Sequence, residues 1–389
     1  MLNNLLEDLF TAYFDARRNK RNTINALSFE LNYESNLFRL YEEIDERNYK
    51  IARSICFINF DPVQREIFAA DFRDRIVHHL VFNYINPIFD KTFINDSYSC
   101  RKNRGTHYGI KRIRRFISQC SNNYAKDCYI MKLDIEGYFM KMDREILYQK
   151  ITDVLRQKRD NLNCDTNLLK YLLQKIIFND PTINCNIRGK KSDWKGLPES
   201  KSLFCAEDNK GFPIGNLTSQ LFGNIYLNEF DHFVKDELKI KYYGRYVDDC
   251  VLVHQDKHYL LECRERIRNY LKKRLALTLH PKKFYLQHYF KGVQFLGACI
   301  KPYRIYIGKR CKTNFYRKIS DWNGKIKIAK DGLSEDQKIE CRANINSYLG
   351  LMKHYNTYKL RKKIILKPIN NSFLKFFKVP ESLDKIILR

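Results

Sequence analysis

Residues 241–254 read KYYGRYVDDCVLVH, in which two runs rich in tyrosine, valine and leucine flank Val247, Asp248 and Asp249. β-branched and aromatic residues favour strands, and a short break between two such runs favours a hairpin. The sequence therefore predicts a β-hairpin that carries two adjacent carboxylates at its tip. An Asp-Asp pair in a hairpin is also ordinary turn chemistry, so its meaning depends on what lies near it.

A second strand is predicted at residues 129–135, where side chains alternate between two faces. Asp134 lies at its end, on the same face as Lys132. If this strand and the hairpin share a sheet, Asp134, Asp248 and Asp249 converge. Carboxylates that close repel one another unless a proton or a cation intervenes. Their hard oxygens suit Mg²⁺, and two ions about 3.5–4 Å apart can hold both oxygens of a phosphoryl transfer.

The rest of the chain mixes helices and strands. Residues 1–125 are predicted to be mainly helical, and residues 211–215 form a rigid turn. Asn216 is then predicted to cap a helix over residues 217–238. Further elements are predicted as a helix at 260–275, short strands at 292–300 and 305–307, and a helical tail from about residue 344. This pattern predicts an α+β fold with an antiparallel sheet.

The chain has 389 residues and a formal net charge of +27 at pH 7. Such a field attracts polyanions, with nucleic acid as the first candidate and an anionic membrane surface as the second. The alternative is a solvated basic surface with no partner. The twelve cysteines form no CxxC pair, which argues against a structural zinc site. With no signal peptide and no apolar run of about 20 residues, a cytoplasmic protein without a membrane span is expected.

Several motifs resemble those of reverse transcriptases and follow the order of that family. YVDD at 246–249 is similar to the family's YxDD box, and MKLDIEGYF at 131–139 to its preceding metal-binding motif. The other motifs are similar to the family's fingers motifs, nucleotide-binding turn, lysine motif and primer-grip hairpin, and are RIVHH (75–79), SYSCR (97–101), GFPIGNLTSQ (211–220), HPKK (280–283) and GVQFLG (292–297). The resemblance covers about residues 60–365.

The resemblance implies a right-hand polymerase fold. Its N-terminal segment and fingers would occupy residues 1–127, its palm 128–300 and its thumb 301–389, with a fingers/palm insertion at about 150–210. It implies an RNA-directed DNA polymerase, a nucleotidyltransferase that synthesises cDNA from a template RNA. The implied partners are the template RNA, the primer or cDNA strand and dNTPs, and the implied cofactor is Mg²⁺, as two ions.

The same resemblance assigns roles to single residues. The implied metal ligands are Asp134, Asp248, Asp249 and the backbone carbonyl of Ile135. Lys283 matches a lysine thought to protonate pyrophosphate, with the adjoining Lys282 as the alternative. Phe139 falls where a bulky ring excludes a ribose 2′-hydroxyl, and its alternative is an ordinary core aromatic. Arg101 falls where family members hold the triphosphate, a task that suits a guanidinium fork.

The nucleotide-binding turn differs from that of many reverse transcriptases, which have Gln where this chain has Ile214 and Ser-Pro where it has Ser219-Gln220. IGNLTSQ (214–220) closely resembles the enzymes of diversity-generating retroelements, which are encoded by bacteria or phages. Those enzymes copy a template RNA with frequent errors at adenines, for mutagenic retrohoming, and work with a small basic accessory protein. The implied nucleotide-binding residues are Arg101, Ile135, Phe139, Ile214, Gly215, Ser219 and Gln220.

Ile214 also has a physical interpretation. Its side chain cannot form a hydrogen bond, and one lost polar contact costs roughly 1 kcal/mol, or several-fold in copying fidelity. The alternative is that Ile214 simply packs the palm and that fidelity is set elsewhere.

Two other interpretations of the whole chain stay open. Another bacterial reverse transcriptase, of the retron, group II intron-like or antiviral kind, would perform the same chemistry in a different biological setting. A catalytically inactive RNA-binding protein on the same scaffold would retain only the fold. In the thumb, residues 359–365 interleave basic and apolar side chains. This helix is expected either to track a phosphate backbone or to present a solvated face.

Overall fold

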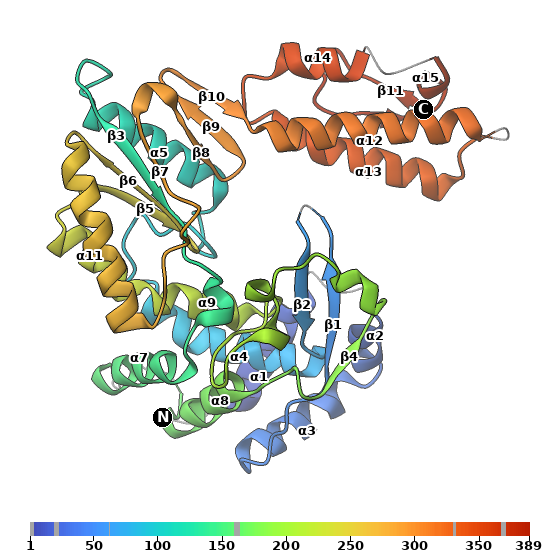
Figure 1. The fold of residues 1–389 in the computed structure, drawn as a ribbon. Helices are drawn as coiled ribbons and strands as arrows, with labels where there is room; N and C mark the ends of the chain where they lie inside the picture. Colours follow the sequence, from blue (N-terminus) through green and yellow to red (C-terminus); the bar gives the residue numbers. More distant parts are fainter. Residues whose placement is uncertain (1–3, 19–22, 62, 159–163, 330–331, 367–370) are drawn as a thin grey trace. The chain divides into compact units, whose positions relative to one another are not determined.

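The computed structural model describes residues 4–18, 23–61, 63–158, 164–329, 332–366 and 371–389. The chain divides into two compact units (Figure 1). Unit 1 comprises Met1–Gly109 and Met131–Leu286, and unit 2 comprises Ile110–Ile130 and Gln287–Arg389. Residues 159–163, which belong to the predicted insertion, lie outside the described residues.

The largest sheet of unit 1 has four strands in the order β5-β6-β3-β7 (Figure 1). Its strands are β3 (Tyr129–Leu133), β5 (Tyr242–Tyr246), β6 (Asp249–His254) and β7 (Tyr285–His288). β5 and β6 pair antiparallel, from Tyr242 opposite Val253 to Tyr246 opposite Asp249. The predicted hairpin is therefore confirmed, and β3 lies next to it in the same sheet.

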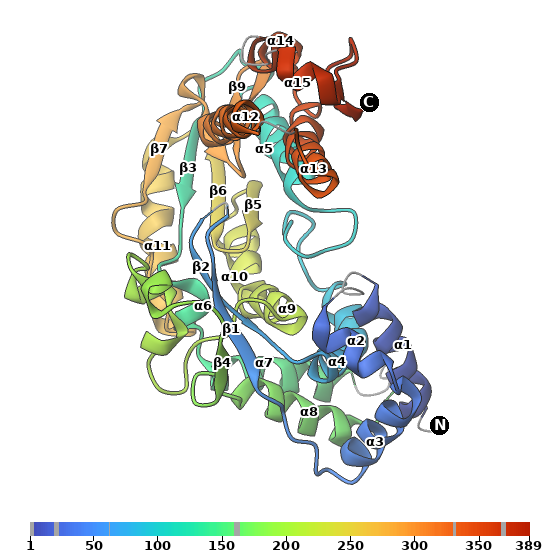
Figure 2. The ribbon, with the colours of Figure 1, turned by 90° about the vertical axis from the view of Figure 1, so that its right-hand side faces the viewer.

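Helices precede and follow the strands of this sheet in sequence, and several of them pack against one another. Those of unit 1 are α1 (Leu5–Arg17), α2 (Ile24–Glu30), α3 (Tyr33–Asp45), α4 (Phe72–Phe89), α6 (Tyr138–Lys141), α7 (Arg144–Gln157), α8 (Thr166–Phe178), α9 (Leu217–Tyr226), α10 (Asn228–His232) and α11 (Lys257–Leu275), with the short 3₁₀ turns η2 (Lys191–Trp194), η3 (Glu199–Lys201) and η4 (Leu203–Cys205). α4 packs against α1 and α9, and α7 packs against α8, as Figures 1 and 2 both show. Within the described residues, no helix is both long and apolar enough to span a membrane.

Aspartate side chains fix the start of several of these helices. Asp71, Asp143 and Asp165 each accept a hydrogen bond from a backbone N–H in the first turn of α4, α7 and α8 respectively. Asp256 accepts two such bonds at the start of α11. Each cap satisfies backbone donors that the helix itself leaves free, and it places a negative charge at the positive end of the helix dipole.

Residues 1–125 are mainly helical, as predicted, but one segment forms strands that the sequence did not predict. β1 (Ser54–Asn59) and β2 (Arg65–Ala69) form an antiparallel hairpin, and β4 (Cys185–Ile187) pairs parallel with β1. Both strands of the hairpin alternate between buried and more exposed residues, a period of two that favours a strand. The buried Glu66 accepts hydrogen bonds from Trp194 Nε1, Ser202 Oγ and the Leu203 backbone, so it attaches residues 194–203 to this hairpin.

The helix predicted over residues 217–238 is interrupted. α9 ends at Tyr226, α10 follows from Asn228, and residues Phe233–Glu237 form a π-helix, η5. Asn216 precedes α9, but its side chain makes no cap hydrogen bond. Its Oδ1 atom instead accepts from the backbone N–H of Ala70, so Asn216 joins the turn to the end of β2.

Unit 2 contains small sheets and four C-terminal helices. Its elements are β8 (Val293–Phe295), β9 (Ala298–Lys301) and β10 (Arg304–Ile307) in the order β10-β9-β8, the pair β11 (Phe377–Lys378) and β12 (Ile387–Leu388), the 3₁₀ turn η6 (Tyr289–Lys291), and helices α12 (Lys309–Ile328), α13 (Glu335–Met352), α14 (Tyr358–Leu366) and α15 (Asn371–Phe376). α5 (Thr106–Cys120) begins in unit 1 and ends in unit 2. The predicted short strands are confirmed. The C-terminal helices begin earlier than the predicted residue 344, because α12 lies wholly before that residue and α13 begins at Glu335.

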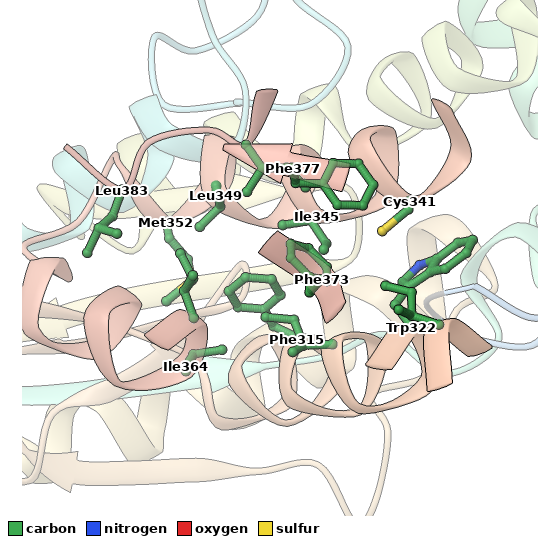
Figure 3. Packing of buried hydrophobic residues seen from close by; sticks show 14 of the residues in the cluster. Phe315, Trp322, Cys341, Ile345, Leu349, Met352, Ile364, Phe373, Phe377 and Leu383 are labelled. Carbon is green, nitrogen blue, oxygen red and sulfur yellow. The ribbon is translucent and has the colours of Figure 1, made fainter. Parts of the chain in front are cut away.

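The core of unit 2 lies between its helices. Phe315 and Trp322 from α12, Ile345 from α13 and Phe373 from α15 are buried and point toward one another in Figure 3. α12 and α13 lie side by side. Apolar contacts of this kind hold the helices together, because each helix buries only one face.

Candidate active site

The tip of the β5–β6 hairpin is a tight turn under backbone strain. Tyr246 pairs with Asp249, so only Val247 and Asp248 form the turn. Val247 has a φ of 55°, a left-handed conformation that a β-branched residue rarely adopts. Strain of this kind costs roughly 1–3 kcal/mol and concentrates at functional sites. The turn holds Asp248 and Asp249 next to each other at the end of the hairpin.

Asp134 follows β3 directly and approaches the same tip. The pKa of the Asp248 carboxyl is raised to about 6, first by burial and then by the negative charges of Asp134 and Asp249. The structure therefore brings together the three carboxylates that the sequence predicted to converge. Their mutual repulsion is the physical signature of a site that favours positive charge.

Two lysines supply positive charge at this site. Lys283 Nζ donates to both carboxylate oxygens of Asp134, at 2.9 and 3.1 Å. Lys132 Nζ lies 2.9 Å from Asp249 Oδ1. Lys283 and not Lys282 forms the contact with Asp134, which agrees with the first of the two alternative registers. Because the Lys283 side chain is 52% exposed, its pair with Asp134 is weak and can be displaced.

The donor set fits a divalent cation. In the part of the chain that the structure describes, no group of three or more His, Cys, Asp or Glu side chains is arranged as a ready metal site. However, carboxylate oxygens are the ligands that Mg²⁺ prefers, and it needs only one or two of them beside water and phosphate. Burial and the negative charges of Asp134 and Asp249 raise the pKa of Asp248 in spite of Lys283, so added positive charge at the cluster would be favourable. Asp134, Asp248 and Asp249 are the residues that would hold such an ion.

The segment after Asp134 is held in place by hydrogen bonds to residues 278–280. The backbone N–H of His280 donates to the Asp134 carbonyl at 2.8 Å, and the Glu136 N–H donates to the Thr278 carbonyl at 2.9 Å. Ile135 forms an isolated antiparallel bridge with Leu279, and its side chain is buried. Residues 278–283 therefore position both the predicted carbonyl ligand, Ile135, and the lysine that contacts Asp134.

A buried arginine supports the hairpin from within. Arg245 donates from Nε and Nη2 to both carboxylate oxygens of Asp231, at 2.7 and 2.6 Å, and both side chains are 0% exposed. Arg245 Nη1 also donates to the carbonyl of the strained Val247, at 2.8 Å. Tyr243 completes the network by donating its hydroxyl to Asp231. The ion pair between Arg245 and Asp231 therefore fixes the turn that carries Asp248.

Arg245 also connects the hairpin to the loop that precedes Arg101. The Arg245 N–H donates to the Asp96 carbonyl, and the Tyr98 N–H donates to the Arg245 carbonyl, each at 2.9 Å. The neighbouring Gly244 lies against this loop, because a Cβ atom there would fall 2.2 Å from the Tyr98 hydroxyl oxygen. Residues 96–98 thus run along β5 as an added edge.

Sequence reasoning missed Arg245, Asp231 and Lys132. A charged residue within a run of apolar and tyrosine residues was a signal that Arg245 needs a buried partner. Its partner lies on a separate helix, α10, where no local spacing could identify it. Lys132 carried a clearer signal, because alternation placed it on the face of Asp134.

Arg101 is placed differently from a free triphosphate ligand. Its guanidinium group pairs with Asp90 at 2.6 Å and donates to the carbonyls of Asp90, Ile94 and Ser97. The side chain is 8% exposed. These contacts make Arg101 an anchor for the loop 94–101, and a role in binding triphosphate would require it to exchange some of them.

The turn at 211–215 contains Ile214, which packs on the same small cluster as Phe139. Both side chains are partly buried against one small cluster that contains Phe68 and Met140. The Ile214 carbonyl accepts from the Phe68 N–H, and Gly215 has a φ of 135° with no room for a Cβ against the Phe68 carbonyl. The two residues with predicted roles in nucleotide selection therefore share one packed surface.

Ser219 and Gln220 lie in the first turn of α9 and face different surroundings. Ser219 is buried, whereas Gln220 is exposed. Gln220 Oε1 accepts a hydrogen bond from Cys100 Sγ at 3.0 Å, which brings it next to the loop that ends at Arg101. On the other side of the turn, Thr218 Oγ1 lies 2.7 Å from Nδ1 of the buried His78.

Comparison with known proteins agrees with this geometry. Residues 64–300, more than half of the chain, match the family model described as reverse transcriptase (RNA-dependent DNA polymerase). The chain is 24% identical to Protein YkfC of Escherichia coli (strain K12) over 257 residues, which are 58% of this chain and 60% of that protein. It is 20% identical to Nuclear intron maturase 1, mitochondrial, of Arabidopsis thaliana over 213 residues, which are 46% of this chain and 28% of that protein.

The chain thus spans 60% or less of the length of these curated relatives. Among solved structures it is similar to a telomerase from Candida albicans in complex with a TWJ fragment of telomeric RNA. That similarity has a TM-score of 0.47 at 11% identity and covers 90% of this chain and 68% of the telomerase chain. The observed mixture of helices and antiparallel sheets agrees with the predicted polymerase fold. On the strength of the family match, the chain is a member of the reverse transcriptase (RNA-dependent DNA polymerase) family.

Proposed function

We propose that this chain is an RNA-directed DNA polymerase that synthesises cDNA on a template RNA by nucleotidyl transfer. The observation that carries the proposal is the crowding of Asp134, Asp248 and Asp249 at one strained turn, with the pKa of Asp248 raised to about 6. A cluster of acids with unbalanced charge at an accessible hairpin tip suits a reaction that brings cations and polyphosphate together.

The residues of the site have distinct proposed roles. Two bound Mg²⁺ ions would supply Lewis-acid activation of the primer 3′-hydroxyl and would neutralise the charge of the leaving pyrophosphate. Asp134, Asp248 and Asp249 bind the cations, with the Ile135 carbonyl as a further ligand. Lys283 holds a proton on Nζ beside Asp134, where it can be donated to the pyrophosphate oxygen as that group leaves.

The proposed nucleotide pocket uses the apolar cluster against which Phe139 and Ile214 both pack. Phe139 excludes a ribose 2′-hydroxyl by clash, because its ring is held against the backbone of α9 near Gly223. Gly215, Ser219 and Gln220 complete the pocket. Arg101 contributes its guanidinium group to the triphosphate after exchanging some of the contacts that anchor it to Asp90, Ile94 and Ser97.

The finer proposal is that the enzyme is the error-prone polymerase of a diversity-generating retroelement. Its support is Ile214, whose side chain packs against an apolar cluster and offers no hydrogen bond to a base pair. Discrimination between correct and incorrect pairs then depends on shape alone. The proposed setting is the cytoplasm of a bacterium, with a template RNA, a primer strand, dNTPs and a small basic accessory protein as partners.

The proposed domains follow the same assignment. Residues 1–127 form the N-terminal segment and fingers, 128–300 the palm with an insertion at about 150–210, and 301–389 the thumb. The two thumb helices α12 and α13 share the core shown in Figure 3.

A primer-extension assay tests the function. Wild-type protein with Mg²⁺, dNTPs and a primed RNA is expected to extend the primer, whereas Asp248→Asn with Asp249→Asn is expected to lower the rate at least about a thousandfold. Asp153→Asn, which removes an exposed aspartate of α7 paired with Arg156, is the matched control and is expected to extend normally. RNA binding without extension by the wild type would instead identify an inactive RNA-binding protein on this scaffold.

A further inference from the structure

A cavity of about 600 Å³ lies within unit 2, and none of its lining residues belongs to the carboxylate cluster or to the proposed nucleotide pocket, although Lys359 and Leu360 come from the basic run at 359–365. It is lined by strand β10, by the first turn of α12 and by the segment that enters α14. All of these elements pack on the one hydrophobic core of unit 2, through Ile307 and Leu360 among others. The walls of the cavity are therefore held by a single packed body.

The charge of the lining is entirely positive. Arg304, Lys312 and Lys359 contribute to it, and none of its residues carries a carboxylate. Within the described residues, the ammonium groups of Lys312 and Lys359 form neither an ion pair nor a hydrogen bond. The first turn of α14, from Tyr358 onward, adds backbone N–H groups that have no partner inside the helix. These groups together favour an anion with several oxygens.

Two aromatic rings make the cavity more specific than a basic patch. Tyr306 is 42% exposed and Tyr358 is 47% exposed, and both line the cavity. Arg304 lies over the Tyr306 ring at 4.8 Å and donates to the Asn356 carbonyl, so one wall is already fixed. The Tyr358 ring stays available to stack against a flat partner. Exposed aromatics interleaved with cations are typical of surfaces that bind single-stranded nucleic acid.

We propose that this cavity binds one unpaired nucleotide of single-stranded RNA, with its base on Tyr358 and its phosphate between Lys312 and Lys359. This inference rests on the proposed function in one respect, since it takes the template RNA as the source of the strand. A free nucleoside triphosphate fits less well, because it travels with Mg²⁺ and the lining has no carboxylate to hold that ion. The site would hold an unpaired stretch of the template outside the copied duplex.

Binding of a fluorescent 12-nucleotide RNA to the full chain, measured by anisotropy without primer or dNTPs, tests the proposal. The double variant Lys312→Gln with Lys359→Gln is expected to weaken binding about tenfold and to lower the slope of log affinity against log salt by about 1.4. The matched control is Lys327→Gln with Lys375→Gln, which removes two exposed lysines of helices α12 and α15. It is expected to weaken binding less than threefold.

A second variant separates stacking from charge. Tyr358→Leu is expected to weaken binding at least about fivefold while the salt slope stays unchanged, because a base loses its aromatic partner and no phosphate contact is lost. All five altered side chains are exposed, so thermal unfolding should match the wild type. Equal weakening by the cavity and control doubles, or an unchanged affinity for Tyr358→Leu, would overturn the proposal.

Two further outcomes identify the ligand and the source of any failure. Displacement of the RNA by excess dATP in EDTA would show that the cavity takes a free nucleotide, which contradicts the strand assignment. No displacement supports it. The cavity double should weaken RNA binding by the same factor in a background that also carries Asp248→Asn and Asp249→Asn. A failure of primer extension would therefore contradict the proposed polymerase activity, whereas the RNA-binding site would still be judged from the binding measurements alone.

Discussion

The body and the tip of the β5–β6 hairpin treat buried carboxylates in opposite ways. Against the body, Asp231 of the neighbouring helix α10 receives a bidentate pair from Arg245 and a hydroxyl from Tyr243, so its charge is fully matched. At the tip, Asp248 is surrounded by Asp134 and Asp249, and burial with like charge raises its pKa to about 6. A matched charge stabilises the fold, whereas an unmatched one favours a cation from outside. The contrast separates structural from ligand-binding acids around one short hairpin.

Replacing Asp231 should break the matched charge and give the largest effect. Asp231→Asn leaves Arg245 buried without its counter-ion, and losses of about 3–5 kcal/mol are typical of that situation. Urea unfolding would measure the loss in the free energy of unfolding. Asp236→Asn, on an exposed aspartate five residues later, is the control and should change stability by less than about 1 kcal/mol. Equal losses in the two variants would contradict the structural role of the pair.

Asp74 offers an intermediate case, because hydrogen bonds reach it but the nearest cation, Arg73 Nη1, is 3.9 Å away. Burial raises its pKa from 3.8 to about 6 despite those bonds. Its protonated form therefore adds stability that is fully present below about pH 4 and is lost as the pH rises through about 6. The shift of about 2 units corresponds to about 3 kcal/mol.

The Asp74 prediction is checked by urea unfolding between pH 4.5 and pH 8. The wild type should lose more stability than Asp74→Asn over this range, because the amide does not titrate. Asp336→Asn, an exposed aspartate in the first turn of α13, should follow the wild-type curve. Parallel curves for the wild type and Asp74→Asn would show that the shift is absent.

Asp248→Asn should have the opposite sign to Asp231→Asn. Removing one of three crowded charges is expected to raise the free energy of unfolding by about 2 kcal/mol at pH 8 in EDTA. In the primer-extension assay with Mg²⁺, the same variant is expected to lose activity. The gain is smaller than the raised pKa alone suggests, because the amide also loses the attraction of Lys283. Thermal unfolding measures the gain. A destabilised Asp248→Asn protein would mean that the tip is not under electrostatic strain.

The smallest expected effect concerns Ile214 and fidelity. Ile214→Gln introduces a side chain that can hydrogen-bond to a base pair, and a net gain of roughly 1 kcal/mol corresponds to several-fold fewer errors. Sequencing cDNA made from a defined RNA measures the error rate at each template base. Ile214→Leu is the control, since it keeps an apolar side chain of equal volume and should leave the rate unchanged. An error rate that is the same for Gln and Ile would assign fidelity to other residues.

Local pattern predicted the hairpin, β3 and α11, because each is specified by the period of its own side chains. It also predicted that Asp134 would meet the hairpin tip, since motif order implied a shared sheet. It did not find β1 and β2, whose five or six residues carry too few repeats to outweigh the helical segments around them. Nor could it pair Arg245 with Asp231, because the contact depends on how α10 packs on β5.

The side chain of Asn216 shows another limit. Its type and position favour a helix cap, yet the Ala70 N–H competes for the same oxygen and wins through a tertiary contact. Arg361 is similar. Its place in a basic run predicted contact with a phosphate backbone or with solvent, but it is buried and bonds to the carbonyls of Ser382 and Leu383. In both cases a partner distant in sequence decides the outcome.

Gly244 has a consequence for mutational tolerance. Because a Cβ atom would fall 2.2 Å from the Tyr98 hydroxyl oxygen, every other amino acid collides with a ring that is itself fully buried. A saturation library at this codon should therefore yield one functional survivor, although the position touches no substrate. If positions 244 and 98 are randomised together, functional variants with alanine or serine at position 244 should be recovered only when Tyr98 has been replaced by a smaller ring or an aliphatic side chain.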